Sequence, residues 1–386
     1  MAVGSFNTRA DRAVTLARMF LLVTGGTGYV GSHAVASLTK AGHRVRILAR
    51  SPDGVSGALA PLGVSGIETS IGDVTDPTAV EGALEGCDGV LHAASVFSMD
   101  PRRADEMRAV NVLGTDTVIG AANRLGLDPI VHVSSELALL PPVRGQVLTP
   151  DSPVKQSTWP YSRSKADSEL VARRYQDAGA PVVSVMPAAV WGPYDPHFGE
   201  GVTLATNVLK RRVPFVPPGG MHIADVRDVA AALVAVIEAG RGQRRFLLGG
   251  QYISMPDLVR TLAELSGRRI PCVTVPSWFL AAFGRAADIV QGHVRTQLPW
   301  TGEGIWVLNC AARCDDTKAR TELAVEPRPL RETFADTISW LEEVGHLSRH
   351  ANRASANSNV KSPNESRPTT LNASAARRPL MDRRSR

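Results

Sequence analysis

Thr24-Gly25-Gly26-Thr27-Gly28-Tyr29-Val30-Gly31 is the stretch that decides the fold. It follows the apolar run 19–23 and opens into residues 31–38, whose apolar positions have helical spacing. A strand, a tight turn and a helix in this order form the phosphate-binding unit of dinucleotide-binding proteins. The glycines allow a sharp turn and a close approach of the backbone to a pyrophosphate, and the helix N-terminus favours its negative charge. The stretch therefore predicts an α/β fold with a doubly wound parallel sheet of the Rossmann type.

The end of the second apolar strand, residues 45–49, indicates which dinucleotide binds. An acidic residue at this point selects NAD by binding the ribose hydroxyls. This chain has Ala49 and then Arg50. Because a planar, permanently charged guanidinium suits a 2′-phosphate, the pattern favours NADP, with NAD as the alternative. Arg50 could instead be a solvated charge at a strand end.

The third and fourth strands, expected at 71–74 and 90–95, supply further candidates for cofactor contacts. The carboxylate of Asp73 can accept a hydrogen bond from an adenine amino group. Ala93 and Ala94 are small residues that leave room for the cofactor. Asn111 lies in a helical stretch that leads to the fifth strand, expected at 130–135.

The fifth strand ends in Ser134 and Ser135, where ligands of open parallel sheets bind. Tyr161 and Lys165 are four positions apart, so on a helix they share one face. A tyrosine with a pKa of about 10 needs a shift of about three units to act as a general base near neutral pH. Its expected source is the Lys165 ammonium, helped by the positive nicotinamide of an oxidised cofactor. With Ser135 bonded to the substrate oxygen, these residues predict hydride transfer between a nicotinamide and a carbonyl carbon. The alternative is a surface helix with a solvated Tyr and Lys.

Together these motifs make the chain resemble, from about Met19 to about Val344, an extended short-chain dehydrogenase/reductase of the epimerase/dehydratase superfamily. The resemblance implies that Ser135, Tyr161 and Lys165 are the catalytic residues and that Asn111 arranges Lys165 through a water. The segment 185–193 is similar to the family's Arg-Pro-x-x-Val-Tyr-Gly-Pro element, with Met186 in place of Arg. The implied cofactor contacts are Thr24, Gly25, Thr27, Gly28, Tyr29, Val30, Gly31, Arg50, Asp73, Val74, Ala93, Ala94, Tyr161, Lys165, Pro187 and Val190.

Two departures from the sugar-nucleotide members indicate the branch that the chain resembles. Those members commonly place Asn before the Val-Tyr-Gly-Pro element, where this chain has Ala189. The serine pair continues into the aliphatic stretch 136–142, and an aliphatic rim suits an apolar substrate. The chain therefore resembles the dihydroflavonol reductase-like and 3β-hydroxysteroid dehydrogenase-like branches. Internal packing of these leucines is the alternative to substrate contact.

Charge and composition limit the partners. The 386 residues carry a net charge of +6, but residues 347–386 hold nine basic and two acidic side chains, so the body is net negative. Nucleic-acid binding by the body is not indicated. We expect a small-molecule substrate and a homodimer. Four scattered cysteines predict neither a disulfide scaffold nor a metal site.

The chain divides into a flexible extension (1–18), a dinucleotide-binding and catalytic domain (19–193), a small substrate lobe (194–346) and a tail (347–386). The lobe is interleaved with returns to the main domain at 222–249. The basic tail lacks large apolar residues and is expected to be disordered. Residues 1–18 contain no continuous apolar run, and together with the cysteine usage this favours the cytoplasm. The apolar segment 273–290 is expected to be a lobe helix, with a peripheral membrane contact as the alternative.

Two other functions remain open. A sugar-nucleotide epimerase or dehydratase would use the same Ser-Tyr-Lys set with tightly held NAD, against which Ala49-Arg50 and Ala189 argue. A non-catalytic dinucleotide sensor would usually lack Tyr161 or Lys165, and both are present.

Overall fold

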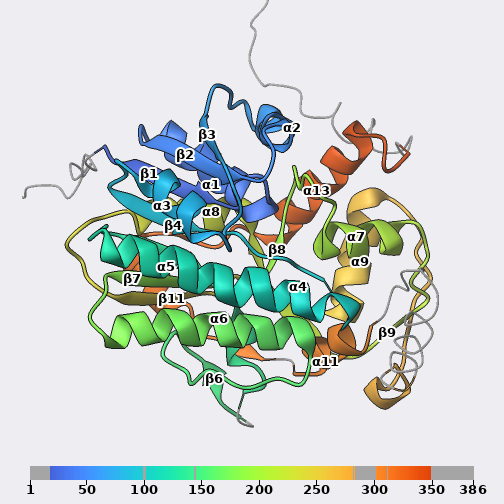
Figure 1. Ribbon diagram of the computed structural model, residues 1–386. Coiled ribbons are helices and arrows are strands. Elements are labelled where there is room, and N and C mark those ends of the chain that lie inside the picture. The colour runs from blue at the N-terminus through green and yellow to red at the C-terminus, as the bar shows by residue number, and fades with distance from the viewer. Residues whose placement is uncertain are drawn as a thin grey trace, which may run out of the picture. The chain divides into compact units, whose positions relative to one another are not determined.

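Seven parallel strands form the central sheet of the protein, in the order β11-β7-β5-β4-β1-β2-β3 (Figure 1). The computed structural model describes residues 18–98, 101–142, 145–280, 282, 301–310 and 312–348. The chain runs outward from β1 in one direction and from β4 in the other, which is the doubly wound order predicted from the glycine turn. The strands are β1 (Phe20–Thr24), β2 (Arg44–Ala49), β3 (Glu68–Ile71), β4 (Gly89–His92), β5 (Ile130–Val133), β7 (Val182–Pro187) and β11 (Arg244–Leu248).

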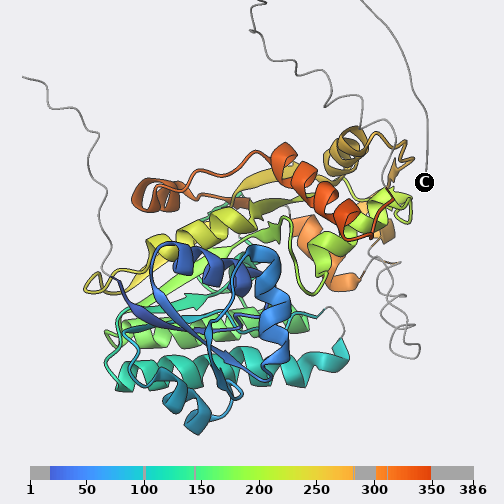
Figure 2. The same ribbon diagram turned by 90° about the horizontal axis from the view of Figure 1, so that it is seen from above.

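Helices cover both faces of this sheet (Figure 2). Successive side chains of β1 point to opposite faces, so Leu21 and Val23 enter one core and Leu22 enters the other. The first core lies under α1 (Tyr29–Lys40), α2 (Asp53–Leu59), α8 (Val226–Ala235) and α12 (Thr317–Leu323). The second lies under α3 (Pro77–Leu84), α5 (Gly114–Arg124) and α6 (Pro160–Asp177).

The expected strands are present, but three of them end earlier than the sequence suggests. β3 ends at Ile71, because residues 72–76 form a turn in which the Asp73 side chain accepts from the Thr75 amide. β4 and β5 end at His92 and Val133. Short helical segments connect the main elements: η1 (Ala60–Leu62), η2 (Pro101–Arg103), α4 (Ala104–Arg108), the π-helical turn η3 (Ala109–Leu113) and η4 (Glu136–Leu139).

A smaller lobe surrounds a separate hydrophobic core. Its sheet consists of β8 (Ala189–Trp191), β10 (Gly220–Asp225) and β12 (Gln251–Ser254). The ring of Trp191 lies 5.2 Å from that of Phe334, so the lobe begins before residue 194. Its helices are α7 (Glu200–Leu209), α9 (Met255–Ser266), α11 (Gly302–Cys310) and α13 (Leu330–Glu343).

Two details of the expected interleaving differ in the structure. The return to the main domain starts at α8 and not at 222, because β10 pairs with β8 and β12. Within the range expected for the lobe, α12 packs into the core of the main domain through Ala319 and Leu323. Two short parallel pairs complete the described chain: β9 (Phe215–Val216) with β13 (Val273–Thr274), and β6 (Val147–Leu148) with β14 (Arg313–Cys314).

The ends of the predicted segments are partly visible. Leu347 is buried in the core of the lobe, so the packed body extends beyond residue 346. The rest of the predicted tail (349–386) and residues 1–17 of the predicted extension lie outside the described residues. In the segment 273–290, Val273 begins the short strand β13, helical residues follow at 277–280, and most positions after 280 lie outside the described residues. Among the described residues, no helix has the length and apolar character needed to cross a membrane.

Candidate active site

The predicted phosphate-binding turn lies between β1 and α1, packed against the end of β4. Gly25 has a φ of 70°, and a Cβ on it would lie 2.5 Å from the Ala94 amide nitrogen. A Cβ on Gly31 would lie 2.0 Å from the Gly25 carbonyl oxygen. Only glycine fits at these two positions. No side chain caps the N-terminus of α1 at Gly28, so its N–H groups and positive helix end suit a phosphate.

The other predicted cofactor residues on this side lie at the carboxyl ends of β2 and β3. Arg50 is exposed, and Asp73 lies near enough for the Arg50 charge to act on it. Hydrogen bonds from the Thr75 hydroxyl and amide, followed by the Arg50 charge, lower the pKa of Asp73. The ionised carboxylate accepts hydrogen bonds, as the sequence argument requires. The roles of both residues stay predictions.

The remaining predicted cofactor contacts differ in how accessible they are. Thr27, Tyr29, Val30, Ala93, Ala94 and Val190 are half-buried, whereas Val74 and Pro187 are buried. The Tyr29 hydroxyl is enclosed and has no hydrogen-bond partner among the described residues, and burial raises its pKa. It remains protonated and is therefore a donor.

The two serines beyond β5 have different surroundings. Ser134 is buried, and its hydroxyl has no partner in the described part of the chain. Ser135 is half-buried and caps η4, where its Oγ accepts from the Leu137 amide at 3.2 Å. The hydroxyl hydrogen of Ser135 is thus left to donate to a ligand.

Tyr161 and Lys165 lie one turn apart at the N-terminal end of α6, as predicted. The ring of Tyr161 meets that of Phe97 edge to face at 4.5 Å. The Lys165 ammonium donates to the Val133 carbonyl at 3.5 Å, which places it at the end of β5. Burial lowers the pKa of Lys165 to about 8, against the opposing effect of Glu169.

The protein's own groups shift the pKa of Tyr161 upward. Burial, followed by the negative charge of Glu303, raises it above its ordinary value. The protein groups therefore keep Tyr161 protonated at neutral pH. The lowering expected from Lys165 and the positive nicotinamide of an oxidised cofactor concerns the site with cofactor bound and stays a prediction.

Asn111 lies in the π-helical turn η3, and its side chain ties three segments together. Its Nδ2 donates to the Val96 carbonyl and to Ser164 Oγ, each at 2.9 Å, and its Oδ1 accepts from the Val96 amide at 2.7 Å. Ser164 Oγ in turn donates to the Tyr161 carbonyl at 2.8 Å. π-helical turns are frequent at functional sites. The water link from Asn111 to Lys165 stays a prediction.

His92, which the sequence argument did not include, connects the glycine turn to this cluster. Its Nδ1 lies 2.7 Å from Thr24 Oγ1, and its Nε2 lies 3.0 Å from Thr115 Oγ1. Because Thr115 donates its hydrogen to the Asn111 carbonyl, it accepts from His92, so the proton of the neutral imidazole is on Nε2. Burial lowers the pKa of His92 to about 3 and keeps it neutral. A histidine inside an apolar strand was the available signal.

Glu303 is a second residue that the sequence argument missed. It lies on α11 of the lobe and is buried with 3% of its surface exposed. Its carboxylate accepts from the Ser162 amide at 2.7 Å and the Ser162 hydroxyl at 2.6 Å, and from the Tyr161 amide at 3.4 Å. No local side chain caps α6, so Glu303 caps the helix of Tyr161 and Lys165 from the lobe.

Two leucines of the predicted aliphatic rim beyond Ser135 are not exposed to a ligand. Leu139 and Leu140 are buried in a small core with Leu148 and Met186. Internal packing, the alternative reading, is therefore correct for these two residues, because the turn η4 directs them under the sheet. The exposed apolar side chain beside Tyr161 is instead Phe97, which is 39% exposed.

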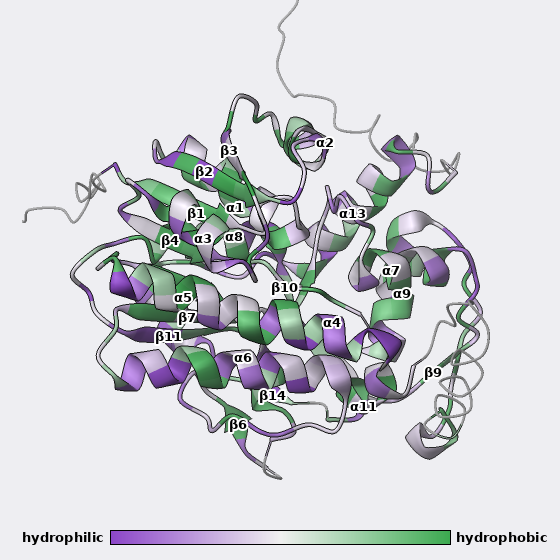
Figure 3. Ribbon diagram, viewed as in Figure 1, coloured by the Kyte–Doolittle hydropathy of each residue, from purple (hydrophilic) through white to green (hydrophobic). Residues whose placement is uncertain are grey.

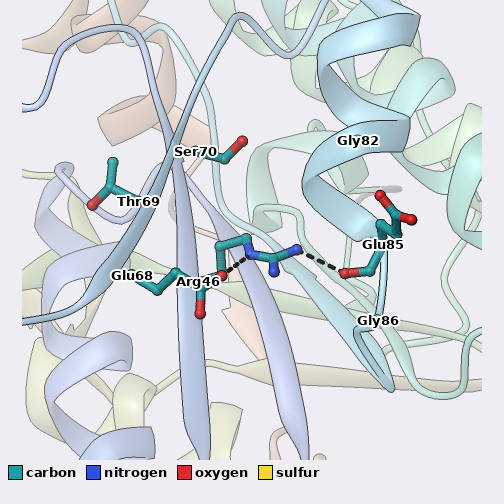
Figure 4. Close-up of a pocket in the computed structure, with 7 residues that line it drawn as sticks. All are labelled: Arg46, Glu68, Thr69, Ser70, Gly82, Glu85 and Gly86. Carbon is teal, nitrogen blue, oxygen red and sulfur yellow. Dashed lines mark hydrogen bonds and ion pairs between the residues drawn. The ribbon is translucent and has the colours of Figure 1, made fainter.

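A polar hollow lies away from this cluster, at the β2–β3 edge of the sheet (Figure 4). Arg46 crosses it and binds Glu68 at 2.6 Å and the carbonyls of Ala83 and Glu85 at 2.8 Å. The guanidinium is thus satisfied by the protein itself, and the hollow contains none of the predicted site residues. Among the described residues, no group of three His, Cys, Asp or Glu could hold a metal ion.

The model of the NAD dependent epimerase/dehydratase family matches residues 21–249. The chain belongs to this family and is an NAD(P)-dependent enzyme. This match covers the glycine turn, the end of β5 and the Tyr161–Lys165 helix, which are the motifs that suggested the resemblance.

The matches to curated relatives cover almost the whole length of each relative. Sterol demethylase protein B of Methylococcus capsulatus is 30% identical, over 85% of this chain and 100% of the relative. A putative dihydroflavonol 4-reductase of Synechocystis is 28% identical, over 84% and 95%. A 3 beta-hydroxysteroid dehydrogenase/Delta 5-->4-isomerase of Mycobacterium tuberculosis is 27% identical, over 88% and 96%. The two branches expected from the sequence are thus both among the chain's relatives.

Proposed function

We propose that the protein is an NADP(H)-preferring oxidoreductase that interconverts a carbonyl and a secondary alcohol on an apolar small molecule. The observation that carries this proposal is the hydrogen-bonded chain from Thr24 through His92, Thr115, Asn111 and Ser164 to Tyr161. It ties the turn suited to a dinucleotide to the helix suited to proton transfer. Thr24 and His92 end β1 and β4, and the carboxyl ends of the strands are where ligands of such sheets bind.

The glycine turn and Arg50 would hold the dinucleotide, which supplies or accepts the hydride when bound. Tyr161 donates its proton to the substrate oxygen as that oxygen gains negative charge during reduction. The raised pKa of Tyr161 keeps this proton on the phenol at neutral pH. Ser135 donates a hydrogen bond to the same oxygen, and Lys165 supplies positive charge nearby.

An apolar substrate is supported by Ala189 and Phe97 and by the relatives named for sterols, a dihydroflavonol and a hydroxysteroid. Phe97 places an exposed ring directly beside the proton-donating phenol. The predicted homodimer and cytoplasmic location stay predictions.

We expect the protein to reduce steroid ketones or flavonoid-type carbonyls with NADPH. The loss of nicotinamide absorbance measures this reaction. The panel should include aliphatic aldehydes, secondary alcohols and sugar nucleotides, each with both cofactors. A C-4 epimerisation of a sugar nucleotide without net loss of nicotinamide absorbance would contradict the proposal and support an epimerase. Cofactor binding without turnover of any class would indicate a sensor.

Arg50→Ala is expected to weaken NADP(H) binding by about 10- to 100-fold, because a charge-assisted contact with the 2′-phosphate is lost. NAD(H) binding should change little, since it has no phosphate at that position. Titration of both cofactors into parent and variant measures the difference. Arg124→Ala is a matched control, because this exposed arginine pairs with Glu81 away from the site. A parent protein that already prefers NAD would refute the premise.

A further inference from the structure

An exposed apolar surface lies on the lobe where β9 and β13 pair. Phe215 and Val273 are directly opposite each other in this pair and are 43% and 58% exposed. Trp278 and Phe279 follow β13 and are 72% and 47% exposed, with ring centroids 6.1 Å apart. We call these four residues, with the basic residues described next, the β9–β13 patch.

Basic side chains precede both strands of the pair. Lys210, Arg211 and Arg212 come before β9, and Arg268 and Arg269 come before β13. Because the two strands are parallel, both basic groups lie at the same end of the pair. The aromatic pair lies beyond the other end, so the patch is basic at one end and apolar at the other. In Figure 3 the segment that follows α7 runs along the edge of the molecule into β9.

The positive charge of the patch is not balanced locally. The segments 207–216 and 267–280 contain five basic and no acidic residues. Lys210, Arg211, Arg212 and Arg269 form no ion pair within the described part of the chain. A cluster of cations beside exposed Trp and Phe side chains fits a surface that offers both negative charge and an apolar layer.

We propose that the β9–β13 patch docks the protein on a membrane surface that contains anionic lipids. Lys and Arg are attracted to anionic headgroups, and Trp and Phe insert at the boundary between headgroups and acyl chains. A second copy of the chain is a poorer occupant, because a two-fold interface would pair the patch with itself, and its segments contain no acidic side chain to partner the five cations. The docking is peripheral and does not depend on the reaction that the site catalyses.

The test uses the full-length chain and vesicles of phosphatidylcholine with or without phosphatidylglycerol. We expect binding to the anionic vesicles, weakened at least about tenfold by Arg211→Glu with Arg212→Glu. Lys40→Glu with Arg124→Glu makes the same charge change on exposed residues outside the patch and should weaken binding much less. Trp278→Ser with Phe279→Ser should also weaken it. Unchanged thermal unfolding of each variant confirms that the fold is retained.

A second measurement identifies the residues that touch the lipid. Lipids brominated on their acyl chains should quench the tryptophan fluorescence of the parent, and Trp278→Phe should remove this quenching while binding persists. Binding that is insensitive to all four substitutions, without quenching, would assign the attraction to other basic residues such as those after 349, and the proposal would be wrong. Absence of binding to anionic vesicles, or self-association that the patch variants abolish, would also overturn it.

Discussion

Tyr161→Phe is expected to lower turnover by about 10²- to 10⁴-fold, the usual contribution of a positioned acid or base. Phenylalanine keeps the ring and therefore its edge-to-face contact with Phe97 at 4.5 Å. It also keeps the backbone that Glu303 and Ser164 bind. Only the transferable proton is lost, so the affinity for the nicotinamide cofactor should stay within a few-fold of the parent. Steady-state turnover and cofactor titration measure the two effects separately.

Tyr175→Phe provides the control on the same helix. The Tyr175 hydroxyl donates to Asp116 Oδ1 at 2.8 Å, near the C-terminal end of α6. Its loss removes one partly buried hydrogen bond, so stability should fall slightly while turnover is nearly unchanged. Comparable turnover in both variants would mean that Tyr161 does not transfer the proton.

Local sequence patterns predicted the main fold and the chemistry-bearing helix. Alternation of Leu21, Leu22 and Val23 between two cores is a property of a strand covered on both faces. The conformation of Gly25 and the close approach at Gly31 follow from the turn itself. The four-residue spacing of Tyr161 and Lys165 required only a helix, and α6 supplies it.

Contacts between distant parts of the chain were not predictable in this way. Glu303 binds Ser162 across 141 positions, and His92 binds Thr24 across 68. No periodicity links such pairs. The orientation of Leu139 and Leu140 was equally open, because an aliphatic stretch after a strand can line a site or fill a core, and the path of η4 decides.

Burial acts against one electrostatic expectation, the lowering of the tyrosine pKa in the site with cofactor bound. Sequence spacing places an ammonium near a phenol and so suggests a lowered tyrosine pKa. It does not show that both groups lie out of water or that a carboxylate from the lobe approaches the same tyrosine. In the protein alone, burial and the charge of Glu303 raise the pKa of Tyr161, and burial lowers the pKa of Lys165.

Lys165→Met is expected to lower turnover by about 10²-fold or more and to move the pH dependence of oxidation upward. Oxidation requires the Tyr161 phenolate, so its rate rises with pH through the pKa of Tyr161. A nearby cation stabilises the phenolate and lowers that pKa, so its removal raises the pKa and moves the rise to higher pH. The positive nicotinamide of an oxidised cofactor would act in the same direction as the Lys165 cation, so the shift is measured with that cofactor bound. Initial rates of alcohol oxidation at saturating cofactor, measured across pH, give the shift.

Glu303→Gln is the matched variant, and it is expected to shift the pH dependence of oxidation in the opposite direction. Glutamine keeps an oxygen that can accept from the Ser162 amide and hydroxyl, but it removes the negative charge that raises the pKa of Tyr161. Loss of that charge lowers the pKa, so the oxidative rate should begin to rise at a lower pH. Opposite displacements in the two variants would establish that the charges of Lys165 and Glu303 act on one titrating phenol. Displacement in the same direction, or none with normal turnover, would show that another group controls the pH dependence.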